Sequence, residues 1–506
     1  MSQAPRAKIK HDTFLWLAWI IFVLLGTGFI YYIFAFFFIP QFNYLGPDGL
    51  AGSDYVTYYL GPLVDEALGP NRSVFVVGDF RAAITQGQVK IAHFNPMYAN
   101  WALRSPEGFI ATPFTLLLFR YSLSRIPFWL SLNLWVVLSI GMLVTVALWS
   151  SGQALSLSTA PLESWHAWRL LSVALMVFVF APSLVSIGLG QINPLVLLFL
   201  VSGLFAYLLL TDPTEQNIST KARRLYWCLG PLCLSIAINI KIVPALLILF
   251  LSALGIWKTF NSRSSSNGFR KSFLSPEISF AALTALWTLL IVIGTIQVDG
   301  MKRSLDWLLL ALPRAINSSA IIAPADLPDL DTYLSFLTRA GVFDASTAQM
   351  IKYTFAGLVV VLAMDVCRMV SNANLKDLVV YRLRLWLAVS FWLLAPFSWT
   401  FMRCHYLIMA MLIFPPLLAA IPKVPLRSDR ITLFILTGLG YVGLSHPIFI
   451  ILMYGRIPNY VALDRFPISV YNLVMGYPAT LLLAMVVWLT IKKTGYAGQK
   501  LSAVIT

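Results

Sequence analysis

Four short segments of the chain carry polar residues whose types suit the transfer of a group between oxygen atoms. These residues are Asp79; Gln191 and Asn193; Lys241; and Arg403 and His405. A carboxylate can act as a general base and take the proton of an attacking hydroxyl. Cationic side chains can stabilise a departing phosphate, and stabilising developing charge is usually the largest catalytic term. Together, these groups suit the transfer of a sugar from a lipid phosphate to a hydroxyl.

Each segment also has a simpler interpretation. Asp79 can be a loop carboxylate that is solvated or paired with Arg81. Lys241 can extend its amine to the lipid headgroups, although apolar segments on both sides leave room only for a tight turn. Gln191 and Asn193 can cap a helix. The single histidine of the fourth segment can be a packing residue, so the prediction depends on the convergence of all four segments.

Other catalytic motifs are missing from the sequence. We find no phosphate-binding GxxxxGK[ST] loop, no glycine-rich dinucleotide motif and no HExxH. The cysteines show no zinc-ligand spacing. They lie in or beside apolar blocks and predict free thiols: Cys228, Cys233, Cys367 and Cys404. We therefore expect no metal and no cofactor, and a sugar donor that is itself a lipid.

The composition predicts which elements must position these residues. Hydrophobic residues make up 59% of the 506-residue chain and charged residues 11%, against about 25% charged residues in an average soluble domain. The apolar residues form blocks of roughly 16 to 26, and about 20 are needed to cross a bilayer as a helix. We predict that the protein is an all-α polytopic membrane protein and that residues 1–506 form a single membrane domain.

Basic residues predict the topology. The net charge of +15 is spread over short loops, which is typical of Lys and Arg retained on the cytoplasmic side. Membrane lipids, and no nucleic acid, are the partners expected from this pattern. With both termini inside, we predict twelve transmembrane helices, near 14–39, 126–150, 166–187, 190–210, 225–240, 243–258, 275–297, 351–370, 384–400, 405–422, 431–455 and 468–491.

The remaining chain predicts two long outer loops, from about 40–125 and about 297–352. A block from Phe109 to Leu123 would invert every later loop if it crossed the membrane, so we expect a re-entrant or interfacial helix there. The second loop contains the apolar stretches 305–313 and 332–341, which suit short helices on the membrane surface. All four polar segments are then expected on the non-cytoplasmic side.

Five segments in order carry a resemblance to a known family. They are GDFRAAITQG (78–87) with NPMY (95–98), ATPFTLLLFRYSLSRIPFWLSLNLW (111–135), GQINPLVLLFLVSGLFAYLL (190–209), AINIKIVPALLILFL (237–251) and LLAPFSWTFMRCHYLIMAMLIFPPLL (393–418). Together they resemble the motifs of the GT-C superfamily of membrane glycosyltransferases. The nearest branch is glycosyltransferase family 87, which includes polyprenyl-phosphate-mannose-dependent mannosyltransferases.

The resemblance implies a GT-C type fold with catalysis at the outer leaflet, in a cavity roofed by the two outer loops. It implies that Asp79 is the general base and that Lys241, Arg403 and His405 contact the donor phosphate. The residues that would shape the cavity are Gln191, Asn193, Trp399, Arg81 and Tyr98. Asp54, in the preceding stretch SDYVTYYLGPLVDEALGPNRSV (53–74), is the rival candidate for the base.

The expected function is that of an inverting glycosyltransferase, a hexosyltransferase of the plasma (inner) membrane. By the resemblance it would move mannose from a polyprenyl-phosphate donor to a glycolipid or glycan acceptor on the outer face. The alternatives are a lipid or small-solute transporter or flippase, and a non-catalytic membrane subunit of a cell-envelope assembly pathway. Transporters often carry internal repeats and ionisable groups near the midplane, and the sequence shows no convincing repeat.

Overall fold

The described part of the chain is helical throughout. The computed structural model describes residues 4–38, 53–87, 89, 109–158, 164–188, 190–210, 219–262, 275–317, 334, 337, 338, 341–372, 377–394, 404–454 and 477–505. No strand occurs in these ranges, which confirms the all-α class for them. The helices, in chain order, are α1 Ala4–Phe38, α2 Ser53–Leu68, α3 Val77–Thr85, α5 Pro113–Arg120, η1 Leu123–Arg125, α6 Phe128–Ser156, α7 Trp165–Val173, η3 Ala174–Val179, α8 Ala181–Gly188, α9 Asn193–Leu210, α10 Thr220–Ile240, η4 Val243–Ala245, α11 Leu246–Ser262, α13 Pro276–Asp299, α14 Met301–Asp306, η5 Trp307–Ala311, α15 Leu312–Asn317, α17 Ala345–Ser371, α18 Leu378–Leu394, η9 Cys404–Leu412, α19 Phe414–Ala420, η10 Ile421–Lys423, α20 Arg427–Tyr454 and α23 Tyr477–Ile505.

Six helical segments of the described chain are long and apolar enough to cross a membrane. They are Asp12–Tyr31, Phe128–Ser156, Asn193–Leu210, Val243–Phe260, Pro276–Asp299 and Ala345–Ser371. A seventh results if the segments on either side of the 61° bend between η3 and α8 are counted as one span. The chain is therefore a helical membrane protein. Each of the twelve predicted ranges holds a described helix, but the number twelve stays a prediction.

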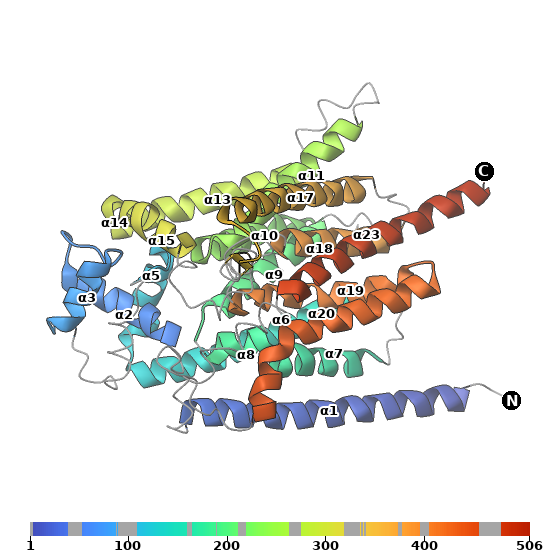
Figure 1. Cartoon of the computed structure of the whole chain (residues 1–506), viewed down its shortest axis with the longest axis horizontal. Coiled ribbons are helices and arrows are strands. Elements are labelled where there is room, and N and C mark those ends of the chain that lie inside the picture. Colours follow the sequence, from blue (N-terminus) through green and yellow to red (C-terminus); the bar gives the residue numbers. More distant parts are fainter. Residues whose placement is uncertain are drawn as a thin grey trace.

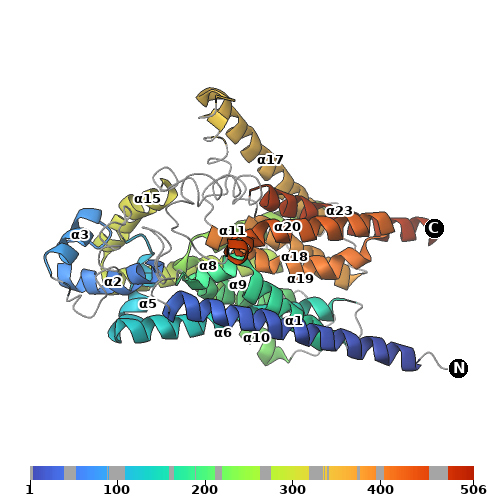
Figure 2. The same cartoon turned by 60° about the horizontal axis from the view of Figure 1, so that its bottom comes forward.

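The helices differ in how much of their surface the protein itself covers. In α9, 72% of the apolar span is buried, against 11% in α1 and 17% in α17. Figure 1 shows α1 along one side of the bundle, and Figure 2 shows α17 leaving the opposite side. A helix that is apolar on every side must be buried in protein or in lipid. α9 is therefore the central helix, and α1 and α17 leave their apolar faces to lipid.

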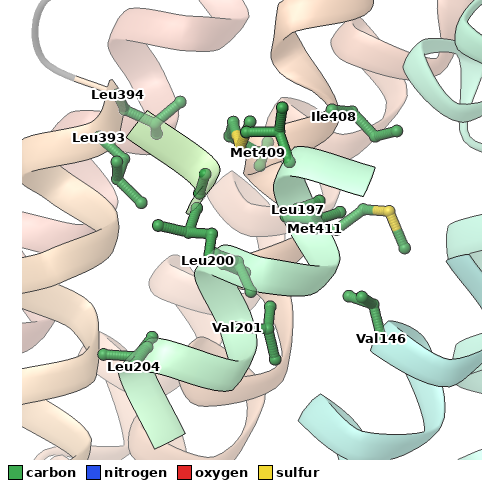
Figure 3. Close-up of a cluster of buried hydrophobic side chains, with 14 of the residues drawn as sticks. Val146, Leu197, Leu200, Val201, Leu204, Leu393, Leu394, Ile408, Met409 and Met411 are labelled. Atoms are coloured by element: carbon green, nitrogen blue, oxygen red, sulfur yellow. The ribbon is translucent and has the colours of Figure 1, made fainter. Parts of the chain in front are cut away.

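The core around α9 is closed by three neighbouring elements. Figure 3 shows Val146 of α6, Leu200 and Val201 of α9, Leu394 of α18 and Met409 of η9 converging on one apolar cluster. All five side chains are buried. Lipid tails are as apolar as these side chains, so close van der Waals packing, more than the hydrophobic effect, holds such helices together.

An ion pair between a partly buried lysine and a buried glutamate joins four helices where α9 and α11 end and where α13 and α18 begin. Nζ of Lys258 lies 2.6 Å from Oε1 of Glu277 and donates a hydrogen bond to the hydroxyl of Tyr381 at 2.7 Å. The hydroxyl of Tyr207 donates to Glu277 at 3.3 Å. Because a buried charge without a partner is strongly destabilising, this cluster fixes the four helix ends relative to one another.

The block from Phe109 to Leu123 forms no transmembrane helix. Its one α-helix, α5, has eight residues, which reach only about 12 Å. In the second outer loop, the stretch 305–313 is helical through α14, η5 and α15, as predicted. The stretch 332–341 lies mostly outside the described residues.

Two glycines allow α9 and α10 to approach closely. A Cβ atom built on Gly230 would lie 2.7 Å from Cβ of Ala206, and one on Gly203 would lie 3.0 Å from the carbonyl oxygen of Gly230. Small residues at membrane helix interfaces permit this kind of backbone contact. The α9–α10 interface therefore depends on the absence of side chains at these positions.

Replacing Gly230 with valine is expected to lower the free energy of unfolding by about 1–3 kcal/mol, because overpacking forces neighbouring atoms apart. Gly294→Val is the matched control, since a Cβ atom at Gly294 meets nothing within 4 Å. The measurement is a denaturant titration of both purified variants in detergent. An equal loss in the two variants would contradict the assignment of a tight α9–α10 contact.

Candidate functional site

Short helices from both of the predicted outer loops gather at one end of the molecule. Figures 1 and 2 show α2, α3, α5 and α14 together at the end opposite to both chain termini. α2 packs against α3 and α5, and α5 also contacts α10 and α13. Residues from distant parts of the sequence are therefore brought together at this end.

The first turn of α2 carries an acid that contacts the segment after α8. Nε2 of Gln191 donates a hydrogen bond to Oδ2 of Asp54. The hydroxyl of Tyr58, one turn further along α2, donates to Oε1 of Gln191 at 3.2 Å. Gln191 is 3% exposed, whereas Asp54 is only partly buried. The amide of Gln191 is thus oriented by Tyr58 and fixes one oxygen of the Asp54 carboxylate.

A left-handed glycine and a tryptophan place Gln191. Gly190 has a φ of 67°, a conformation that glycine adopts at least cost. The backbone N–H of Gln191 donates to the carbonyl of Ser186 at 2.8 Å. Nε1 of Trp135 in α6 donates to the carbonyl of Gly190 at 3.1 Å. Asn193 is fully buried at the start of α9, so the whole predicted motif lies inside the protein.

Lys241 lies in a tight turn that α5 holds in place. α10 ends at Ile240 and η4 begins at Val243, so only two residues separate them, which confirms the predicted turn. The hydroxyl of Thr112 donates to the carbonyl of Asn239, and the hydroxyl of Thr115 donates to that of Ile240 at 3.4 Å. Because α5 also packs on α2, it connects the Lys241 turn with the helix that carries the rival acid.

Asp79 makes its hydrogen bond within its own loop. It lies in the first turn of α3, and its Oδ2 accepts a hydrogen bond from the backbone N–H of Ser73 at 3.2 Å. Arg81, on the same helix, is partly buried. Among the described residues, Asp79 forms no hydrogen bond or ion pair with Gln191 or Lys241. The structure thus brings Gln191 to Asp54 and leaves Asp79 in a local contact.

Part of the predicted site carries no structural statement. Tyr98, Trp399 and Arg403 lie outside the described residues, and only the backbone of His405, in η9, is described. Whether these residues join the others at this end of the molecule stays a prediction.

Two residues of this cluster are not among those predicted from the sequence. Tyr58 has a signal, because it follows Asp54 by four residues and so shares a face with it on any helix. Trp135 has no such signal beyond its place in the matched segment 111–135. It donates a hydrogen bond to the backbone carbonyl of Gly190, and no pattern of side chains in a sequence predicts such a contact.

Two aspartates and two arginines form a buried cluster beside α2, which we call the outer ion bracket. Arg120 of α5 pairs with Asp65 of α2, and its Nη1 lies 3.1 Å from Oδ1 of Asp299 at the end of α13. Nε of Arg303 in α14 lies 2.7 Å from Oδ1 of Asp65, and its Nη1 lies 3.6 Å from Oδ1 of Asp299. Both aspartate side chains are at most 1% exposed. The bracket is neutral and joins four elements.

Burial raises the pKa of Asp65 to about 6. Among its charged neighbours, Arg303 and Arg120 lower the pKa and Asp299 raises it, and burial outweighs the two arginines. The folded protein therefore binds a proton at Asp65 more tightly than the unfolded chain, in which the pKa is 3.8.

Comparison of the chain with protein-family models, with curated proteins and with solved structures gave no significant match. The resemblance to glycosyltransferase family 87 rests on the sequence motifs alone. Within the described ranges, no three His, Cys, Asp or Glu side chains are grouped so that they could hold a metal ion.

Protonation of Asp65 is expected to give the protein a measurable pH dependence of stability. Because the folded pKa is raised, the contribution of Asp65 is fully present below about pH 4 and is lost as the pH rises through 6. A shift of about two pKa units corresponds to about 3 kcal/mol. Denaturant titrations of wild type and Asp65→Asn between these limits should show that the free energy of unfolding of the wild type increases relative to that of the variant as the pH falls. A difference that stays constant over this range would contradict the assignment.

Proposed function

We propose that this chain is an inverting glycosyltransferase of the GT-C type. It moves a sugar, mannose by the family resemblance, from a polyprenyl phosphate to a lipid or glycan acceptor on the outer face of the plasma membrane. The observation that carries the proposal is the hydrogen bond from Gln191 to Asp54. It joins a residue of the matched segment 190–209 to a carboxylate at the end where the predicted outer loops gather. The twelve-span topology belongs to the same proposal.

Asp54 is the better candidate for the general base. Its carboxylate is partly buried and contacts Gln191, whereas Asp79 accepts a hydrogen bond from Ser73 inside its own loop. A general base must come within hydrogen-bond reach of the proton that it removes. α2 presents Asp54 near the elements that carry the other motif residues, and this placement supports it over Asp79.

The proposed step needs one carboxylate and several cations. The acceptor hydroxyl gives its proton to Asp54 while its oxygen bonds to the anomeric carbon of the donor sugar. The bond between that carbon and the phosphate oxygen breaks, and polyprenyl phosphate leaves with the electron pair. Attack on the face opposite to the phosphate inverts the anomeric configuration. Lys241, Arg403 and His405 stabilise the charge that develops on the phosphate.

The position of Lys241 supports its role beside the phosphate. The turn that carries it is held by Thr112, the N-cap residue of α5, and by Thr115 within α5. α5 packs on the helix that carries Asp54. A cation and a carboxylate are thus placed on connected elements. Conversion of the ammonium group to a neutral side chain would remove stabilisation of the leaving group and leave the base in place.

Substituting Asp54 with asparagine is expected to lower kcat by at least about 100-fold, because an amide cannot take the proton of the acceptor. The measurement is transfer of radiolabelled sugar from a panel of polyprenyl-phosphate sugars to a native lipid extract by the purified protein. Asp79→Asn is the matched control, since it makes the same change in another acid of the first outer loop. It is expected to keep most of its activity.

The opposite pattern, with collapse in Asp79→Asn and full turnover in Asp54→Asn, would assign the base to Asp79. If folded wild-type protein transferred sugar from no donor, the enzyme proposal would fail. A lipid or solute transporter, or a non-catalytic subunit of cell-envelope assembly, would then be favoured.

A further inference from the structure

One face of α2 carries both of its aspartates. Asp54, Tyr58, Gly61 and Asp65 follow one another at intervals of four, three and four residues, and at about 3.6 residues per turn they form a single stripe. Pro62 lies within α2, and the helix continues through it. Asp54 and Asp65 are separated by about three turns, or about 16 Å, and differ in direction by only about 20°. A rotation or slide of α2 therefore moves both acids together.

The stripe makes contacts along its whole length. Its first two turns contact Gln191 through two hydrogen bonds. A Cβ atom on Gly61 would lie 2.4 Å from the ring of Phe109, so that ring packs directly on the helix backbone. At Asp65 the stripe ends in the outer ion bracket. One face of α2 thus connects the candidate site with the buried charges.

Neutral hydrogen bonds hold the neighbouring face of α2. The hydroxyl of Tyr55 contacts that of Ser131, and the hydroxyl of Tyr59 donates to the carbonyl of Ile126 at 2.8 Å. A neutral hydrogen bond contributes little net stability, whereas removing one partner from a buried ion pair is strongly destabilising. The outer ion bracket is therefore the contact that α2 is least able to leave.

Arg303 links the second outer loop to the end of α2. Its Nη1 donates to the carbonyl of Asp299 at 3.0 Å, and its Nη2 donates to that of Gly69, just after α2, at 3.3 Å. Nζ of the preceding Lys302 donates to the carbonyl of Asn71 at 2.6 Å. α14 thus holds both the last turn of α2 and the chain that follows it.

We propose that Asp65 and Arg303 are positioning residues that set the place of the Asp54 carboxylate through helix α2, which joins the two acids. Neither acts on the substrate directly. The effect on catalysis rests on the proposed function, with Asp54 as the base. The effect on the position of α2 does not, so the two can be tested separately.

The first test compares two adjacent isosteric substitutions near neutral pH. Asp65→Asn removes a charge from the outer ion bracket and leaves both arginines facing Asp299. Glu66→Gln removes a charge one residue later, from an exposed pair with Arg125, and such pairs contribute little. Hydrogen exchange over α2, followed by mass spectrometry, should accelerate at least about tenfold in Asp65→Asn. The acceleration should include residues 57–60, near Gln191, and Glu66→Gln should exchange there as the wild type does.

A second pair of variants tests the other side of the bracket. Arg303→Met should reproduce the exchange pattern of Asp65→Asn. Arg303→Lys should give a smaller acceleration, because lysine keeps the charge but cannot reach all of the partners of a guanidinium at once. If Asp65→Asn fails to fold, Arg303→Lys provides the same comparison in a variant that keeps the bracket neutral.

In the sugar-transfer assay, Asp65→Asn and Arg303→Met should lower kcat with little change in the KM for the donor, because the base is displaced while the phosphate contacts remain. Faster exchange confined to residues near Asp65, or equal acceleration in Glu66→Gln, would overturn the inference. If the exchange pattern is found but the wild type transfers no sugar, the positioning role stands and the proposed function fails.

Discussion

A charge that leaves water without a partner is strongly destabilising, and this constraint organises both ends of the molecule. At one end, the outer ion bracket draws its four residues from α2, α5, α13 and α14. At the other, Lys258 and Glu277 pair between α11 and α13. Between the two clusters the core around α9 is apolar. The paired charges set the register of the helices, and the apolar middle supplies the close packing.

The features that sequence analysis predicted correctly depend on local patterns. The length of an apolar block is enough to predict a membrane helix, and six such helices are described. The turn at Lys241 follows from two apolar segments, 225–240 and 243–258, that are separated by very few residues in the sequence. The helix over 305–313 follows from a short apolar run. A transmembrane helix between Phe109 and Leu123 was excluded because it would invert every later loop. None of these predictions needs knowledge of which helices are neighbours.

The candidate site could be predicted only in part, because its contacts are distant in sequence. Asp54 and Gln191 are 137 residues apart, and Arg120 and Asp299 are 179 apart. No local pattern relates such pairs, so the sequence offered the acid of the stretch 53–74 only as a rival to Asp79. In the structure this stretch contains α2, whose spacing of polar residues at four, three and four is a helical signal that could have favoured Asp54. The number of spans rests on the distribution of basic residues along the sequence, and the six long apolar helices of the described chain do not fix it.

The contacts of α5 also have a consequence for biosynthesis. Thr112 binds a carbonyl 127 residues further along the chain, and Arg120 binds an aspartate 179 residues further along. Chains emerge from the ribosome at about 5–20 residues per second, so roughly 10 to 35 s pass between the synthesis of Arg120 and that of Asp299. During that interval, Arg120 and Asp65 have only each other within the bracket. This end of the nascent protein therefore closes only after both α13 and α14 have been made.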